Sequence, residues 1–181
     1  MPNPQIYKSI HGRSFGLGPN NELIANKESA GGAPLAQARV ESIARVLITS
    51  AQLLALNATP QTLVPAPGAG KAILFSRMLV HKAAGTAYAG IAGGEDLQVR
   101  YTAAAGAVAG GILETTGFLD QATAQTRRLA DIGGIEATST SKIVTENAPI
   151  VLHLQSAEII TGTSDLICHV YYDVIDFALT M

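Results

Sequence analysis

The residue types that most often carry chemistry are scattered along this chain. The four histidines, His11, His81, His153 and His169, form neither a His-x-His pair nor a His-Glu-x-x-His pattern. Because ligand sets that can be read from a sequence need such spacing, we expect no metal site. Cys168 is the single cysteine, and His169 beside it would point to the opposite face of a strand. We therefore expect Cys168 to be a buried structural residue rather than half of a thiol–imidazole pair.

Two further patterns resemble catalytic or binding motifs without meeting their requirements. A phosphate-binding loop needs Gly where this chain has Pro65 and a Ser or Thr where it has Ala72, so residues 65–72 predict a rigid turn before a strand. There is no Gly-x-Ser-x-Gly elbow, and apart from Glu95-Asp96 the carboxylates are dispersed singly. Paired acids for glycoside chemistry stay open, because their spacing is tertiary. The sequence predicts no catalytic residue and no cofactor, and so not an enzyme.

Composition narrows the function classes further. Of 181 residues, 14% are charged and 48% are apolar, with a formal net charge of −2. Such a sparsely charged chain is typical of a subunit that hides surface in an assembly. Direct nucleic-acid binding is not expected, because no cluster of Lys and Arg is present. The apolar run 103–113 is too short to cross a membrane, and the N-terminus shows no secretory signal, so we expect synthesis in a cytoplasm.

Short β-rich runs separated by turn residues follow from residue 43 onward. The predicted strands are 43–49, 59–64, 71–82, 96–102, 112–118, 143–144, 149–155 and 166–177. A single helical turn capped by Ser50 and a short helix from Asp120 to about Ala130 complete the expected elements. Residues 103–111 fit either a weak strand or a small-residue helix. The chain lacks the repeated helices of βαβ units, so the pattern favours an antiparallel jelly-roll-like β-sandwich over residues 43–181.

Residues 1–42 differ from the rest of the chain and are interpreted as an N-terminal arm and linker. They are rich in Pro, Gly, Asn and Ser, and 18–21 predicts a turn between two very short strands. Apolar residues in such a segment gain most when a partner orders them. The candidate contact residues are Ile6, Tyr7, Ile10 and Phe15.

Several ordered strand-and-turn strings in the chain resemble one family. They are Leu53–Phe75 (LLALNATPQTLVPAPGAGKAILF), Val99–Thr102, Thr116–Asp120, Pro149–Leu152 and Val170–Val174. These strings are similar to the jelly-roll cement, or decoration, proteins of tailed-bacteriophage heads, over roughly residues 43–177. The resemblance implies a non-enzymatic virion protein, made in the host bacterial cytoplasm, that forms dimers or trimers. It also implies binding to the outer surface of the capsid, where such proteins bridge major capsid subunits and stabilise the shell.

Two alternatives stay open at the level of sequence. A host-receptor or carbohydrate-binding module of the virion would share the sandwich, but it would present polar and aromatic residues in its loops; the chain offers no Trp and five Tyr. A hydrolase on a β-scaffold would need a convergent nucleophile, acid/base pair or metal set, and the sequence shows none. Fold by itself does not decide between these functions.

Overall fold

The computed structural model describes residues 7–8, 13–17, 23–27, 41–91, 93–130 and 143–177. The chain divides into two compact units, Met1–Glu41 and Ser42–Met181. In the first unit, β1 (Tyr7–Lys8), β2 (Arg13–Leu17) and β3 (Leu23–Lys27) pair as an antiparallel sheet in the order β1-β2-β3. The strands β2 and β3 are the two short strands expected on either side of residues 18–21.

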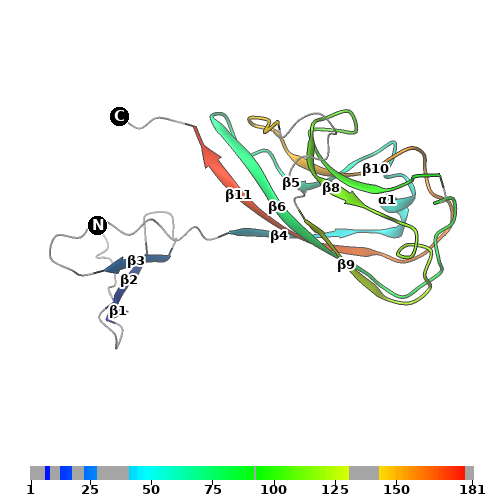
Figure 1. Cartoon of the computed structure of the whole chain (residues 1–181), viewed down its shortest axis with the longest axis horizontal. Helices are drawn as coiled ribbons and strands as arrows, with labels where there is room; N and C mark the ends of the chain where they lie inside the picture. Colours follow the sequence, from blue (N-terminus) through cyan, green and yellow to red (C-terminus); the bar gives the residue numbers. More distant parts are fainter. Residues whose placement is uncertain are drawn as a thin grey trace. The chain divides into compact units, whose positions relative to one another are not determined.

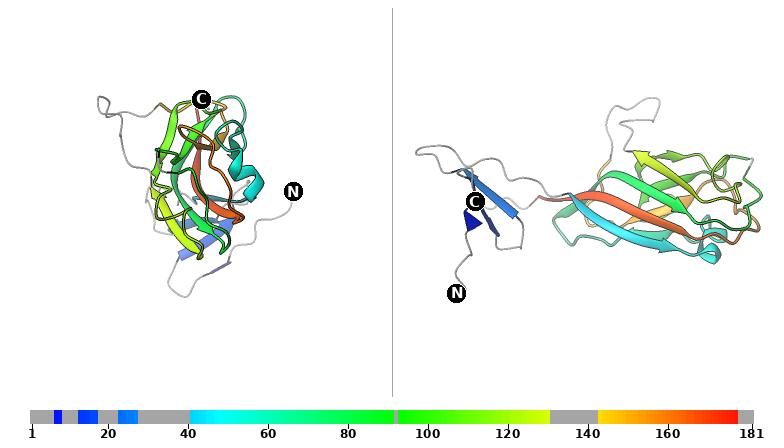
Figure 2. Two further views of the ribbon diagram at one scale, coloured as in Figure 1. Left: turned by 90° about the vertical axis from the view of Figure 1, so that its right-hand side faces the viewer. Right: turned by 90° about the horizontal axis from the view of Figure 1, so that it is seen from below.

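The second unit is a sandwich of two four-stranded antiparallel sheets (Figures 1 and 2). Its strands are β4 (Ser42–Ile48), β5 (Gln61–Val64), β6 (Lys71–Lys82), β7 (Leu97–Tyr101), β8 (Val108–Leu113), β9 (Gln125–Ala130), β10 (Ile150–Leu154) and β11 (Leu166–Asp176). One sheet has the order β4-β11-β6-β9 and the other β5-β10-β7-β8. The predicted antiparallel sandwich is confirmed.

The strand order is that of a jelly roll. The first of the eight strands pairs with the last, the second with the next to last, and so inward to β7 beside β8. This is the arrangement that results when one long antiparallel hairpin rolls up into two sheets. The space between the sheets is filled by one cluster of buried side chains, which includes Phe75, Met78, Leu97, Ile150 and Leu166.

A β-bulge in β6 explains why that strand shows apolar residues at both parities. Tyr171 pairs with Arg77 and Tyr172 with Phe75, so Ser76 is an extra residue in the ladder. Before the bulge the odd-numbered residues of β6, such as Phe75, face the core, and after it the even-numbered ones, such as Met78, do so. A bulge shifts the alternation of a strand by one residue, so a single strand can satisfy two parities.

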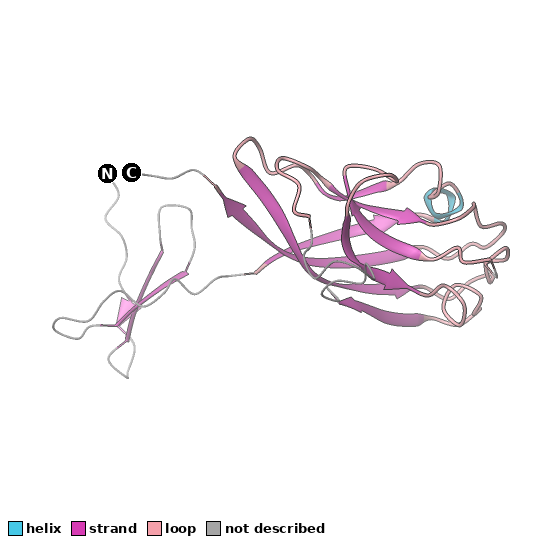
Figure 3. Ribbon diagram, turned by 45° about the horizontal axis from the view of Figure 1, so that its top comes forward, coloured by secondary structure: helices cyan, strands magenta, loops and turns pink. Residues whose placement is uncertain are grey.

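The short helix α1 (Ser50–Leu54) lies at one end of the sandwich, among the loops (Figure 3). Its N-cap is Thr49 rather than the predicted Ser50. The Thr49 hydroxyl accepts a hydrogen bond from the Gln52 N–H, and the Gln52 side chain accepts one from the Thr49 N–H, which completes a capping box. Ser50 N–H instead donates to Asp165. Ser is the slightly better cap by type, but the Gln three residues after Thr49 completes a capping box that Ser50, followed by Leu53, cannot form.

The helix predicted from Asp120 to Ala130 is wrong. Residues 125–130 form β9, whose Leu129 is buried opposite Met78 of β6. Pairing along β6 outweighs the modest helix propensity of this segment.

Other strand boundaries also need correction. The segment 103–111, which the sequence left undecided, is a turn followed by the start of β8. The strand predicted over 112–118 ends at Leu113, where Thr115 N–H bonds to the Asp96 carboxylate. Residues 143–144, predicted as a strand, lie outside any strand. In the first two cases hydrogen bonds within loops replace the ladder that the residue types favoured.

Candidate functional site: an exposed sheet face

The candidate site lies on the water-facing side of the β4-β11-β6-β9 sheet, and we call the twelve outward positions in the rows where all four strands pair the outer face. They are Ile43, Arg45 and Leu47 of β4; Ile167, His169 and Tyr171 of β11; Arg77, Leu79 and His81 of β6; and Thr126, Arg128 and Ala130 of β9. The intervening residues, such as Cys168, Val80 and Leu129, are buried. The pairing register aligns the twelve in three rows of four across the sheet, and the right-hand view of Figure 2 shows these strands side by side.

The outer face carries exposed apolar side chains. Ile43 is 58% exposed and Leu47 is 54% exposed, both on the edge strand β4. Half of the twelve positions are apolar or aromatic, whereas the water-facing side of an antiparallel sheet normally alternates to polar residues. Large contiguous apolar surface on a folded domain is typical of an interaction site.

The same face carries positive but no negative side chains. Its charged residues are Arg45, Arg77 and Arg128, and the first acid, Asp173, comes in the next row along β11. The Arg77 guanidinium lies 3.9 Å from the centre of the Tyr171 ring. This contact places one cation over the Tyr171 ring. Arg45 and Arg128 are exposed.

The opposite sheet has a different outer side. Val151 and His153 of β10 point away from the core, and yet they are only 3% and 7% exposed. Arg100 Nε donates to Gln98 Oε1 at 2.7 Å, and Gln155 Nε2 donates to the same oxygen at 3.1 Å. A polar network of this chain's own side chains therefore covers the middle of this sheet, while Ile112 on the edge strand β8 is 47% exposed.

His153 is the titratable group at the centre of that covering network. Burial lowers its pKa, and the neighbouring Arg100 lowers it further, while Asn57 and Glu158 act in the opposite direction. Its Nδ1 atom is buried, with no hydrogen-bond partner. The neutral ring therefore belongs to the folded state.

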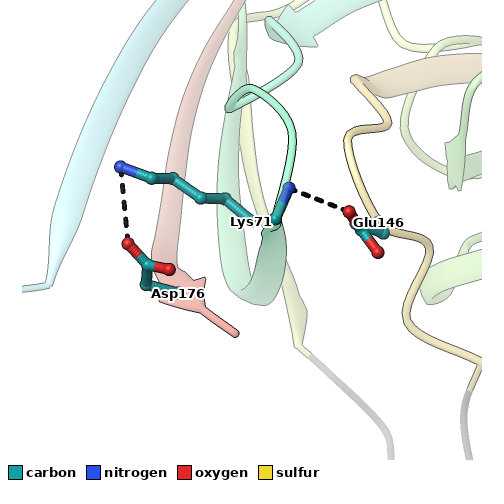
Figure 4. A network of polar contacts seen from close by, with 4 residues as sticks. Lys71, Glu146 and Asp176 are labelled. Atoms are coloured by element: carbon teal, nitrogen blue, oxygen red, sulfur yellow. Dashed lines mark hydrogen bonds and ion pairs between the residues drawn. The ribbon is translucent and has the colours of Figure 1, made fainter. Parts of the chain in front are cut away.

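The loop that resembled a phosphate-binding motif uses its N–H donors internally. Gly70 N–H donates to the Glu146 carboxylate at 2.8 Å, and Gly68 N–H donates to Asn147 Oδ1 at 3.0 Å. Figure 4 shows Glu146 beside this turn and the ion pair of Lys71 with Asp176, 3.7 Å apart. Because a carboxylate already occupies the place that an anion would take, the turn has a structural role.

The other candidate residues are structural too. Cys168 is buried between β4 and β6, and burial raises the pKa of its thiol to about 12, so it is not a nucleophile. Among the described residues, no three His, Cys, Asp or Glu side chains are grouped so that they could hold a metal ion. The described segments contain no helix long and apolar enough to cross a membrane.

The arm residues proposed from the sequence are placed only in part. Tyr7 and Phe15 are register partners in the β1–β2 ladder, so the backbone brings these two positions together. Ile6 and Ile10 lie outside the described residues.

Sequence reasoning missed the outer face. The signal was present in β4, where Ile43 and Leu47 fall on the opposite parity to Val46 and Ile48, but it reads equally well as a strand buried on both sides.

No protein-family model, curated protein or solved structure matches this chain.

Proposed function

We propose that this protein is a non-enzymatic structural component of a tailed-phage virion. It binds the outside of the head, bridges major capsid subunits and stabilises the shell, as a cement or decoration protein does. The observation that carries the proposal is the outer face, where Ile43 and Leu47 are exposed, whereas the outward residues of β10 at the middle of the other sheet are buried by the chain itself. A face of this kind is completed when another surface covers it.

Two further observations support a binding role. The four buried aromatic residues Phe75, Phe118, Tyr88 and Tyr101 belong to the core, and Arg77 lies over the ring of Tyr171 on the outer face, so these five offer little platform on which a sugar ring would stack. The jelly roll is a rigid scaffold whose sheet face is held by a ladder on both sides of β11. Many copies on one lattice would each bury modest area and together add considerable stability.

The N-terminal arm supplies the second contact in this proposal. Ile6, Tyr7, Ile10 and Phe15 would anchor it along a neighbouring capsid subunit, while the sandwich covers the first subunit. Two linked contacts bind far more tightly than either alone when one lattice presents both sites. Assembly as a dimer or trimer would multiply the same effect.

The test adds the purified full-length protein to expanded heads that lack it. Bound copies are counted on gels after sedimentation of the heads, and the temperature at which the heads release DNA is recorded. We expect the double variant Ile43→Asp/Leu47→Asp to lose at least about tenfold in affinity, because two carboxylates would be desolvated in an apolar contact. Ile112→Asp is the matched control, since Ile112 is 47% exposed on the other sheet.

The outcomes separate the parts of the proposal. Wild-type and Ile112→Asp protein should bind and raise the release temperature, and the double variant should do neither. Wild-type protein that leaves heads unoccupied would refute the capsid function. Equal binding by all three would place the contact elsewhere, and the variant lacking residues 1–42 would then show whether the arm alone carries it.

A further inference from the structure

Charge is unevenly distributed over the sandwich. The described residues of the second unit, 42–91, 93–130 and 143–177, hold seven Lys or Arg and nine Asp or Glu. Three of the seven bases lie on the outer face, and none of the nine acids does. The remainder of this unit thus carries four bases against nine acids. Among the described residues of this unit, the outer face therefore carries only positive charges and the remainder carries an excess of acids.

From this separation we infer the chemistry of the partner: the outer face docks on a carboxylate-bearing protein surface, and long-range attraction steers the encounter. The inference rests on the proposed function in taking that surface to belong to the capsid. Arg45 and Arg128 stand at opposite sides of the same row, with His169 and Leu79 between them. Apolar residues beside them would exclude water from the ion pairs, and complementary charge of this kind raises association rates and fixes orientation.

A second copy of this chain is a poorer occupant of the face. Two copies joined through the same face by a two-fold axis would bring three arginines against three arginines, which is repulsive. A contact between the outer face of one copy and an acidic region of the next leaves a free face at each end, and such head-to-tail contacts form rings or open filaments. Binding to a different protein with acidic side chains involves neither arginine repulsion nor an uncovered face at each end.

The test measures binding to expanded heads as a function of salt. Wild type, the double variant Arg45→Gln/Arg128→Gln and the control Lys71→Gln are compared between about 50 and about 500 mM NaCl, a range over which screening becomes strong. Arg45 and Arg128 are both exposed and are replaced together. Lys71 is also on β6, but it lies outside the outer face, in an exposed ion pair with Asp176. The control therefore removes one positive charge without changing the face.

We expect wild-type affinity to fall as salt rises. At low salt the arginine double variant should bind about threefold to tenfold more weakly, with a shallower salt dependence, and Lys71→Gln should match the wild type. If wild type and double variant bind heads equally at every salt concentration, the acidic-partner inference is overturned while the capsid function stands.

Two other results also decide the matter. If the wild-type protein does not bind heads at all, the capsid function fails. Retention of the wild-type protein on immobilised poly-L-glutamate at low salt then tests the acidic partner separately. Retention that the arginine double variant loses would support it, and equal or absent retention would overturn it. Self-association of the free wild-type protein that the double variant abolishes would make a second copy the partner and overturn the inference.

Discussion

The two sheets of the sandwich share one core and differ in their outer sides. In the β5-β10-β7-β8 sheet, the outward residues Val151 and His153 of the central strand β10 are nearly inaccessible. In the β4-β11-β6-β9 sheet, the outward residues of the central strand β11 are half-buried, and Ile43 and Leu47 on the edge strand β4 are 58% and 54% exposed. The chain thus covers the middle of one sheet itself, although Ile112 on the edge strand β8 stays 47% exposed, and leaves the other sheet open.

This difference shows how a small domain can separate stability from binding. The side chains of Gln98, Arg100 and Gln155 form hydrogen bonds within the chain, so these groups are already engaged and are not available to a binding partner. The open sheet keeps apolar and cationic side chains that contribute little to the isolated fold. Substitutions in the β5-β10-β7-β8 sheet should therefore lower the free energy of unfolding, and substitutions on the outer face should lower the affinity for the partner.

The largest expected contrast is between Val151→Asp and Leu47→Asp. A carboxylate at Val151, which is 3% exposed, would be buried without a partner, and we expect a loss of about 3–5 kcal/mol in the free energy of unfolding. The same residue at Leu47, 54% exposed, should change it by less than about 1 kcal/mol. Urea unfolding of the full chain measures both.

A fallback keeps this comparison decisive. If Val151→Asp does not fold, Val151→Thr should still cost about 1–2 kcal/mol, because it buries a hydroxyl in place of a methyl group. A large loss at Leu47, equal to that at position 151, would show that the open sheet is covered in the free protein, and the distinction between the two sheets would fall.

A smaller contrast compares an arginine from each sheet. Arg100→Ala removes the 2.7 Å bond to Gln98 Oε1 and the 3.1 Å bond to the Gly106 carbonyl, and we expect a cost of about 1–3 kcal/mol. Arg77→Ala removes the stacking on Tyr171, which is worth about 0.5–1 kcal/mol at a surface. Thermal and urea unfolding of the two variants should rank them in that order, and the reverse order would place the tighter polar network on the open sheet.

The strands could be predicted from the sequence where residue types typical of β-strands run on without interruption between turn residues. Residues 71–82 were predicted as a strand and form β6 with the same bounds, and residues 166–177 give β11 with one residue fewer. The pattern failed at residues 120–130, because β9 is an edge strand whose buried Leu129 is its main contact with the core. Local propensity there favoured a helix, and only the tertiary pairing with β6 makes a strand.

The site was harder to predict than the fold. The sequence shows apolar residues at both parities of β4 and β6, but it does not reveal which parity faces the core. In β6 the answer depends on the bulge at Ser76, a tertiary feature with no sequence signature here. Nor does the sequence show that Arg45, Arg77 and Arg128, spread over three strands, share one face. The arm residues were chosen by type, and the pairing of Tyr7 with Phe15 adds only their proximity.

The smallest expected effect is a pH dependence that originates in the covered sheet. Burial and then Arg100 lower the pKa of His153 below its ordinary value of about 6.5, so the unfolded chain takes up this proton more readily than the folded chain. The stability that the neutral ring contributes is complete above that ordinary pKa, and it is lost as the pH falls through it toward the lower folded-state value. His153→Gln should remove this part of the slope, so the wild-type and variant stability curves should run parallel above about pH 7.5 and converge or cross below about pH 6.5. Urea midpoints between these limits measure the difference. Curves that stay parallel throughout would mean that the His153 ring reaches solvent in the folded chain. The β5-β10-β7-β8 sheet would then be less completely covered than the 7% exposure of His153 indicates.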